Sequence, residues 1–277
     1  MFNPLRNLLM FVLLMAVFAG CKKDDTPKGS DANNSIVEDA PANQRSLTLN
    51  INQYVGGYYE SIPNHYLETT KKYPLIIFLH GAGQLGDGGR DLPLVLNDGI
   101  AKIISEKKFP PNFNIDGNNF SFVVLSPQFR AIPPDAMVLS FLNYALAHYR
   151  VDPEKIYFAG ISMGGVLTTE MAGQFASRIA AAVSVSGASF GADQSSNAAG
   201  IAAGGVPLWA FHNSGDPVTP SSVTTNFVNM VNADSPLVPA RATIFQSAVH
   251  DAWTKALDPL YKENNQSIYE WMLKFKK

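Results

Sequence analysis

A serine flanked by glycines is the first group in this sequence that could perform covalent chemistry. Ser162 lies in the run Gly160-Ile-Ser-Met-Gly-Gly165, after an apolar strand-like segment and before a helix-like one. In such a strand–turn–helix junction the glycines relieve close backbone contacts, and the serine hydroxyl is presented on a sharp turn. The helix N-terminus adds N–H groups and a positive dipole that can stabilise a developing oxyanion. The pattern predicts that Ser162 attacks a carbonyl carbon.

A second serine has a similar setting and must be weighed against the first. Ser189 lies in Gly187-Ala-Ser-Phe-Gly191, which also follows an apolar run. The stretch 191–205 is rich in Gly, Ala, Ser and Asn, so we expect a loop there, with no helix directly after Ser189. Ser189 is therefore predicted to be a loop serine.

A nucleophilic serine needs a base, and the base needs a carboxylate to orient it. Of the five histidines only His250 follows both Ser162 and a plausible acid, in the chain order serine, acid, histidine. The favoured acid is Asp216, just after the apolar run 208–211, although it could be a simple turn aspartate before a proline. Asp251 and Asp193 are the other candidates. Asp251 adjoins His250 and should point elsewhere, and Asp193 lies in the expected loop.

The run Leu79-His-Gly-Ala-Gly83 follows another apolar strand and resembles the oxyanion loop of lipases and esterases. This resemblance implies that the backbone N–H groups of Ala82 and Met163 hold the tetrahedral oxygen. The glycines at 81, 83 and 86 also fit a dinucleotide-binding fingerprint, but no helix follows them and no acid ends a strand about 20 residues later. Nicotinamide binding is excluded on that ground, and His80 is expected to bond neighbouring loop backbone.

Short apolar runs and segments of helical period alternate along the body of the chain. Strands are expected at 46–51, 54–62, 75–79, 120–125, 156–159, 180–185, 208–211 and 242–245, and helices at 136–149, 163–175, 221–231 and 267–275. Such alternation predicts an α/β fold with right-handed crossovers and a mostly parallel central sheet. Between Ser186 and Pro207 there is no room for a lipase-sized cap, so no large lid domain is expected.

Taken together, these motifs resemble the α/β-hydrolase fold, and in particular the esterases and peptidases related to polyhydroxybutyrate depolymerases and carbohydrate esterases. The resemblance rests on five motifs in order: Tyr73 to Gly83, Ser126-Pro-Gln128, Gly160 to Gly165, Trp209 to His212 with Asp216, and His250-Asp-Ala-Trp253. It implies a sheet with helices on both faces, with Ser162, Asp216 and His250 as nucleophile, acid and base. Two departures, 213–215 in place of a glycine-rich stretch and Val249 in place of a glycine, affect the loops that carry the acid and the base.

The N-terminal residues read as an export signal. Arg6 precedes an apolar run from Leu8 to Ala19, which at twelve residues is too short to span a bilayer. Phe18-Ala-Gly-Cys21 resembles the lipobox of bacterial lipoproteins, which implies that Cys21 carries a lipid. The domain prediction is therefore a signal peptide at 1–20, a flexible lipid-tethered linker at 21–44 and a catalytic domain at 45–277. The run Lys22-Lys-Asp-Asp25 resembles the residues that follow the cysteine in lipoproteins passed to the outer membrane. Such lipoproteins are often displayed on the cell surface.

Composition excludes several other classes of function. A formal charge of −2 leaves no basic excess for nucleic acid, and a single cysteine excludes a disulfide framework and a multi-cysteine zinc site. No metal and no cofactor is expected, because a serine, a base and an acid suffice for acyl transfer.

The favoured function is hydrolysis of a carboxylic ester through an acyl-serine intermediate. A serine peptidase of the same fold and a non-catalytic lipid-tethered binding protein are the alternatives. An exported esterase with an open site would suit small-molecule esters or acetyl and feruloyl esters on polysaccharides. Phe129 and Trp253 are candidate substrate contacts, whereas Trp209 is expected in the core.

Overall fold

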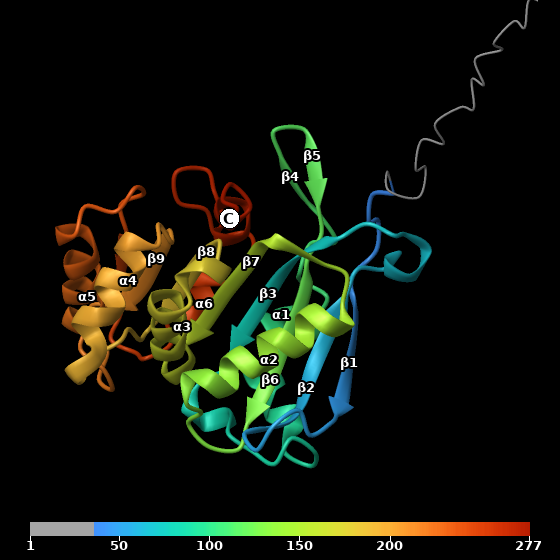
Figure 1. Ribbon diagram of the computed structural model, residues 1–277, viewed down its shortest axis with the longest axis horizontal. Helices are drawn as coiled ribbons and strands as arrows, with labels where there is room; N and C mark the ends of the chain where they lie inside the picture. The colour runs from blue at the N-terminus through green and yellow to red at the C-terminus, as the bar shows by residue number, and fades with distance from the viewer. Residues whose placement is uncertain (1–35) are drawn as a thin grey trace, which may run out of the picture. The chain divides into compact units, whose positions relative to one another are not determined.

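Eight strands of the described chain form one large sheet, in which a single strand runs against the others (Figure 1). The computed structural model describes residues 36–277. In the order of the sheet the strands are β1 (Asn43–Thr48), β2 (Val55–Ile62), β6 (Val123–Phe129), β3 (Tyr73–Leu79), β7 (Val151–Ile161), β8 (Ala181–Val185), β9 (Leu208–Asn213) and β10 (Arg241–Phe245). β2 pairs antiparallel with β1 and β6, and the remaining pairs are parallel.

The continuous apolar runs of the sequence become the central strands. Every residue of β3 and of β6 is buried, as expected for parallel strands that are covered on both faces. β1 lies at the edge of the sheet, and its residues are exposed or half-buried. The predicted α/β-hydrolase fold with a mostly parallel sheet is confirmed.

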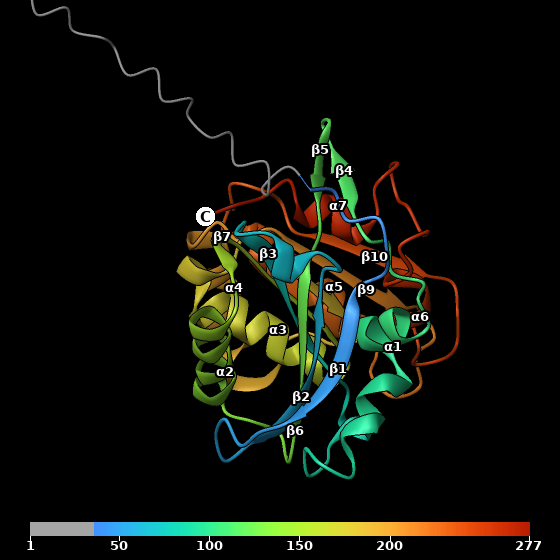
Figure 2. The ribbon, with the colours of Figure 1, turned by 90° about the vertical axis from the view of Figure 1, so that its right-hand side faces the viewer.

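Two sets of helices cover the two faces of the sheet. On one face lie α2 (Asp135–His148), α3 (Met163–Gln174), α4 (Gln194–Ala203) and α5 (Ser222–Ala233), which contribute Phe141, Leu167 and Phe227 to one core cluster. On the other lie α1 (Gly99–Ser105), α6 (Trp253–Ala256) and α7 (Ile268–Met272), whose Ile100 and Tyr269 belong to a second cluster. Figure 2 shows α2, α3 and α4 on one side of the sheet and α1 and α6 on the other.

Shorter elements complete the described chain. A separate hairpin joins β4 (Phe113–Ile115) to β5 (Asn118–Phe120). At its turn Asp116 and Gly117 both have positive φ, 50° and 83°, as tight two-residue hairpin turns require. The 3₁₀ turns are η2 (Tyr66–Glu68), η3 (Ala82–Gln84), η4 (Leu92–Asn97), η5 (Ala176–Arg178) and η6 (Gly191–Asp193).

The prediction of a loop at 191–205 is wrong, because most of this segment forms α4. Its small residues allow close packing on α3. A Cβ on Gly200 would lie 2.3 Å from the carbonyl oxygen of Gly173, and a Cβ on Gly173 would lie 2.6 Å from the Cα of Asn197. Gly200 thus serves close contact between two helix backbones rather than flexibility. α1 and the β4–β5 hairpin were also not predicted.

The folded part of the chain begins earlier than the expected boundary at residue 45. Glu38 is 1% exposed, and its carboxylate accepts a hydrogen bond from the backbone N–H of His65 at 2.7 Å. Asn112 donates to the backbone oxygen of Glu38 at 2.7 Å. The proposed signal peptide, Cys21 and most of the linker lie outside the described residues. Within residues 36–277 no helix has the length and apolar character needed to cross a bilayer.

Candidate active site

Ser162 occupies the turn between β7 and α3 with an unusual backbone conformation. Its φ is 51° and its ψ −117°, and its N–H donates to the carbonyl oxygen of Val185 at 2.8 Å. The neighbouring glycines are required by space: a Cβ on Gly160 would lie 2.1 Å from the oxygen of Gly164, and one on Gly164 would lie 2.0 Å from the oxygen of Leu79. A non-glycine residue in this region of φ is held there by its surroundings, a form of strain found at functional sites.

Three polar side chains from three different loops meet at this turn. His250 Nε2 lies 2.9 Å from Ser162 Oγ, and His250 Nδ1 lies 2.6 Å from Asp216 Oδ2. The loops that carry them follow β7, β9 and β10, which end at the same edge of the sheet. The carboxylate is fully buried, whereas 18% of the His250 side chain is exposed. The structure thus brings together the serine, base and acid that the sequence pattern predicted.

Asp216 is held in its ionised form by its hydrogen bonds. Burial opposes ionisation, but the bond with His250 and the N–H groups of Thr219 and Val218 outweigh it and keep the pKa of the carboxyl below its usual value. Val218 and Thr219 donate to Oδ1 at 2.8 and 3.1 Å, which leaves Oδ2 for the imidazole. The carboxylate therefore has a fixed orientation toward His250.

A second histidine contacts the same carboxylate, and the sequence interpretation missed it. His212, fully buried at the end of β9, places Nε2 3.1 Å from Asp216 Oδ2 and 2.9 Å from the oxygen of Thr219. Both partners are acceptors, so Nε2 carries the hydrogen, and Nδ1 accepts from Thr224 Oγ1 at 2.8 Å. Burial lowers the pKa of His212, which favours this neutral form. The sequence signal is the place of His212 in the motif that carries the resemblance, four residues before Asp216.

None of the other candidate residues forms a side-chain hydrogen bond with His250 within residues 36–277. Asp251 is exposed and accepts hydrogen bonds from the backbone N–H and the hydroxyl of Thr254 at 2.8 and 2.7 Å. Ser189 is buried, and its hydroxyl accepts from Asn197 Nδ2 at 2.9 Å. Asp193 is exposed in η6.

The loop after β3 lies against the Ser162 turn and presents the backbone groups expected to bind an oxyanion. Ala82 begins η3 and Met163 begins α3, and neither N–H donates to a backbone carbonyl of residues 36–277. The side-chain oxygen of Gln84, a residue 3% exposed, accepts from the N–H of Gly81 at 2.9 Å. The Gln128 amide nitrogen donates to the backbone oxygen of Gln84 at 2.9 Å. Two buried amides therefore hold this loop in place.

His80 and Phe129 are structural. His80 is fully buried, its Nδ1 donates to the oxygen of Gly81 at 2.7 Å, and its Nε2 accepts from the N–H of Phe129 at 3.0 Å. Burial lowers the pKa of His80 to about 4, so the ring is neutral near pH 7. The expected substrate contact at Phe129 is wrong: its side chain is 0% exposed and packs on the His80 ring, with centroids 5.3 Å apart. In this strand, which is covered on both faces, neither side of the pleat reaches solvent.

A cavity of about 340 Å³ opens beside Ser162 and is here called the serine cavity. Its wall is mostly apolar and includes Ile132, Met163, Val166, Leu167, Ala188 and Phe190. Phe190 and Ile132 are 63% and 64% exposed, so two large apolar side chains stand at its rim. Glu170 supplies a carboxyl group to the lining, and burial, together with the charges of Asp135 and Asp193, raises its pKa to about 7.

Trp253 lies directly against the base. Its ring centroid is 5.1 Å from that of His250 at an interplanar angle of 88°, and its Nε1 donates to Asp98 Oδ1 at 3.1 Å. It is half-buried, so part of the indole is accessible. In the part of the chain that the structure describes, no group of three His, Cys, Asp or Glu side chains is placed to hold a metal ion.

Comparison with known sequences shows the family. The family model described as phospholipase/carboxylesterase matches residues 67–266, which include Ser162, Asp216 and His250. The chain belongs to the phospholipase/carboxylesterase family. The description of this family supports a carboxylic ester hydrolase. No curated protein matches the sequence.

Solved structures similar to this carboxylesterase-family chain support the fold. A thermostable esterase matches with a TM-score of 0.57 and 22% identity over 87% of this chain, which spans 64% of the length of that protein. The feruloyl esterase module from Clostridium thermocellum, in a mutant form complexed with sinapinate, matches with a TM-score of 0.56 and 14% identity over 84% of this chain and 89% of its own. An acylaminoacyl peptidase from Pyrococcus horikoshii matches with a TM-score of 0.54 and 14% identity over 76% of this chain and 38% of its own.

Proposed function

We propose that the protein hydrolyses carboxylic esters through an acyl-serine intermediate, with Ser162 as nucleophile, His250 as base and Asp216 as the orienting acid. The observation that carries the proposal is the continuous hydrogen-bonded chain from Asp216 Oδ2 through His250 to Ser162 Oγ, with distances of 2.6 and 2.9 Å. These lengths lie within hydrogen-bond reach for proton transfer. No cofactor takes part in the proposed reaction.

In the first step His250 Nε2 accepts the hydroxyl proton as Ser162 Oγ bonds to the ester carbonyl carbon. The carbonyl oxygen becomes an oxyanion, which the N–H groups of Ala82 and Met163 stabilise. The C–O bond to the alcohol then breaks, and the imidazolium returns its proton to the leaving alkoxide. Water repeats the sequence on the acyl-serine, with His250 again acting first as base and then as acid.

Acyl esters carried by polysaccharides, including feruloyl esters, are the proposed substrates. The serine cavity has an apolar wall, large enough for a short acyl or aryl-acyl group, and its rim carries the exposed ring of Phe190. The fold is shared with the feruloyl esterase module from Clostridium thermocellum. Kinetic constants for p-nitrophenyl acetate, butyrate and ferulate, and for acetylated and feruloylated xylan, would test this assignment.

Peptide hydrolysis is the competing activity, because the same groups can protonate a leaving amine. The fold is also shared with an acylaminoacyl peptidase, of which this chain covers 38%. Matched ester and anilide substrates with the same acyl group separate the two activities, and we expect the ester to be cleaved much faster because an alkoxide leaves more readily than an amine. Efficient anilide cleavage with slow ester cleavage would overturn the ester proposal, and no turnover of either would favour a binding protein.

The nucleophile can be identified by covalent labelling. A fluorophosphonate probe should modify Ser162, and Ser162→Ala should abolish both labelling and ester hydrolysis. Ser189→Ala is the matched control, because Ser189 lies in a similar glycine-flanked sequence but bonds to Asn197. An adduct on Ser189 in the mass spectrum would reverse the assignment.

Export and lipid anchoring at Cys21 complete the proposal, with the outer membrane as the destination. The support is in the sequence: the only cysteine directly follows an apolar run and the lipobox-like Phe18-Ala-Gly. Metabolic labelling with a fatty acid in a bacterial host should mark the wild type and not Cys21→Ala. Label that persists in Cys21→Ala would refute anchoring at this residue without affecting the ester hydrolase proposal.

A further inference from the structure

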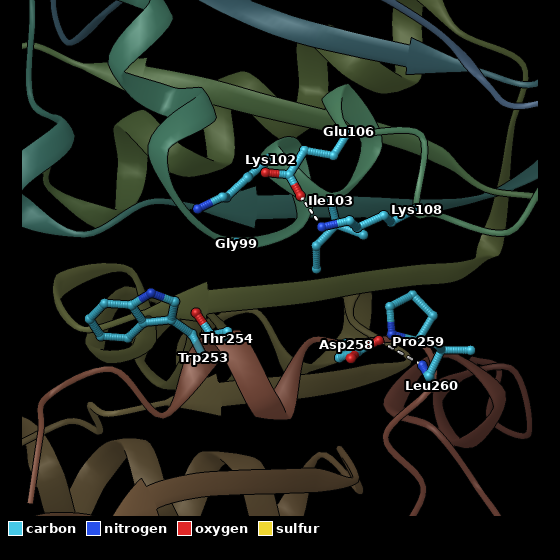
Figure 3. A pocket seen from close by; sticks show the side chains of 10 residues that line it. All are labelled: Gly99, Lys102, Ile103, Glu106, Lys108, Trp253, Thr254, Asp258, Pro259 and Leu260. Atoms are coloured by element: carbon cyan, nitrogen blue, oxygen red, sulfur yellow. Dashed lines mark hydrogen bonds and ion pairs between the residues drawn. The ribbon is translucent and has the colours of Figure 1, made fainter.

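A second cavity, of about 580 Å³, lies between α1 and the segment that begins with α6, and is here called the α1 cleft. One wall comes from Gly99 to Lys108 and the other from Trp253 to Leu260. Figure 3 shows these two groups of side chains facing one another. The lining residues are Gly99, Lys102, Ile103, Glu106, Lys108, Trp253, Thr254, Asp258, Pro259 and Leu260.

Trp253 connects the α1 cleft to the catalytic base. It lines the cleft and also contacts His250 edge to face, with ring centroids 5.1 Å apart. Asp98, at the start of α1, fixes the indole through its 3.1 Å hydrogen bond with Nε1. One wall residue of the cleft therefore contacts the imidazole that must give a proton to the leaving alcohol.

The two halves of an ester have different requirements at this site. The acyl half becomes bonded to Ser162, which lines the serine cavity. The alcohol half must bring its oxygen to His250 Nε2 to receive the proton, so it lies on the imidazole side of the reacting bond. Trp253 in the wall of the α1 cleft contacts that imidazole, and the cleft shares no lining residue with the serine cavity.

The lining of the α1 cleft combines flat apolar surface with polar groups. The indole of Trp253 and the side chains of Ile103, Pro259 and Leu260 supply the apolar part. Lys108 is paired with Glu106 at 2.8 Å, whereas Lys102 forms no ion pair within residues 36–277. In Figure 3 the Lys102 chain extends toward the end of the cleft that holds the indole. A sugar ring matches this pairing, because its C–H face stacks on an aromatic ring and its oxygens accept hydrogen bonds from an ammonium group.

We propose that the α1 cleft is a subsite for the sugar chain of an ester-bearing polysaccharide, with a sugar ring stacked on Trp253 and its oxygens bonded by Lys102. The inference rests on the proposed ester hydrolase function and adds the place where the sugar chain of the substrate binds. The cleft, lined over ten residues, has room for more than the alcohol oxygen of a small ester.

Binding can be measured without turnover in the Ser162→Ala variant. The probes are unesterified xylo-, manno- and glucurono-oligosaccharides of six sugars, tested by calorimetry and by tryptophan fluorescence. Trp209 and Trp271 are 0% and 5% exposed, so a fluorescence change on binding reports Trp253. We expect at least one oligosaccharide to change the fluorescence and to bind at least tenfold more weakly when Lys102→Ala or Trp253→Ala is added.

Lys274→Ala is the matched control, because this lysine is exposed and lies outside the cleft lining. Thr254→Trp is a second test variant in case Trp253→Ala misfolds. The new indole fills the cleft from its exposed rim and should also weaken binding. With an active serine, Lys102→Ala should lower the ratio of kcat/KM on an acylated oligosaccharide to kcat/KM on p-nitrophenyl acetate by about tenfold, mainly through KM.

The proposal is wrong if no oligosaccharide binds at 10 mM, or if binding is equal in Lys102→Ala, Thr254→Trp and the parent protein. Its failure is distinct from that of the proposed function. Ester turnover with no oligosaccharide binding would remove the subsite alone, whereas oligosaccharide binding with no turnover of any ester would remove the hydrolase proposal alone.

Discussion

Replacing Asp216 by asparagine tests the proposed acid through hydrogen-bond geometry rather than through size. Oδ1 of Asp216 accepts two backbone N–H groups, and Oδ2 accepts from two imidazoles. An asparagine has one oxygen, and the N–H groups of Val218 and Thr219 would hold it in the Oδ1 position. The new NH₂ group would then face the nitrogens of His250 and His212, both of which are donors in the wild type.

The expected loss follows from the protonation of the base. To accept a hydrogen bond from the NH₂ group, His250 must carry its proton on Nε2, and that nitrogen can then no longer accept the proton of Ser162. The same change in a Ser-His-Asp triad costs about 10⁴-fold in kcat. At about 1.36 kcal/mol per factor of ten, this loss is roughly 5.4 kcal/mol of transition-state stabilisation. KM should change little, because Asp216 does not line the serine cavity.

Steady-state hydrolysis of p-nitrophenyl butyrate measures the effect, and circular dichroism with thermal melting verifies that the variant is folded. Asp251→Asn is the control, since this exposed carboxylate bonds only to Thr254 in the described structure. We expect it to stay within about twofold of wild type, as is usual for an exposed residue away from the reaction. An Asp216→Asn variant that is folded and within tenfold of wild-type kcat would refute the reasoning about the tautomer.

Three further outcomes follow from the described environment of single residues. The pKa of Glu170 is raised to about 7, so the serine cavity gains a negative charge between pH 6 and 8. Over that range kcat/KM for the anionic p-nitrophenyl hemisuccinate, divided by kcat/KM for p-nitrophenyl butyrate, should fall about fivefold, which corresponds to about 1 kcal/mol. A fall that persists in Glu170→Gln would contradict this prediction. Burial lowers the pKa of His80 to about 4, below the value of about 6.5 in the unfolded chain. Because the unfolded chain therefore takes up the proton first, roughly 3 kcal/mol of the free energy of unfolding should be lost as the pH falls from about 6.5 to about 4. Urea unfolding at several pH values measures this loss, and His148→Gln, an exposed control, should leave it intact. Gly200→Ala should lower the free energy of unfolding by about 1–3 kcal/mol, because its Cβ would lie 2.3 Å from the α3 backbone. Ser195→Ala, at an exposed position of the same helix, is the control and should not lower it. Equal melting temperatures for the two variants would refute the packing argument.

The sheet and the order of the reactive residues were predictable because each rests on a local signal. A buried parallel strand leaves an unbroken apolar run such as 75–79, and the Ser162 turn requires glycines at 160 and 164. Chain order then separated His250 from the other histidines. These signals need no knowledge of which distant segments touch.

The features that the sequence did not predict depend on contacts between segments that are distant in the sequence. The glycines of 191–205 favoured a loop, and the packing of Asn197 and Gly200 against Gly173 in the folded protein holds a helix there. His212 ends a buried strand, and its bond to Asp216 is set by the turn between them and by Thr224 on α5. Phe129 follows a polar motif in the sequence, but both faces of its strand are covered, which no periodicity of the strand itself reveals.

The separation of the two cavities means that the two sides of the reacting bond are encoded in different segments of the chain. The residues that line the serine cavity lie between positions 132 and 219, and those that line the α1 cleft lie within 99–108 and 253–260. Substitutions at Ile132 or Phe190 can therefore alter acyl preference without touching the wall on the alcohol side. Homologous enzymes with this fold could therefore change their preference for the acyl group or for the alcohol separately. Mutant libraries limited to one set of segments would test each preference independently.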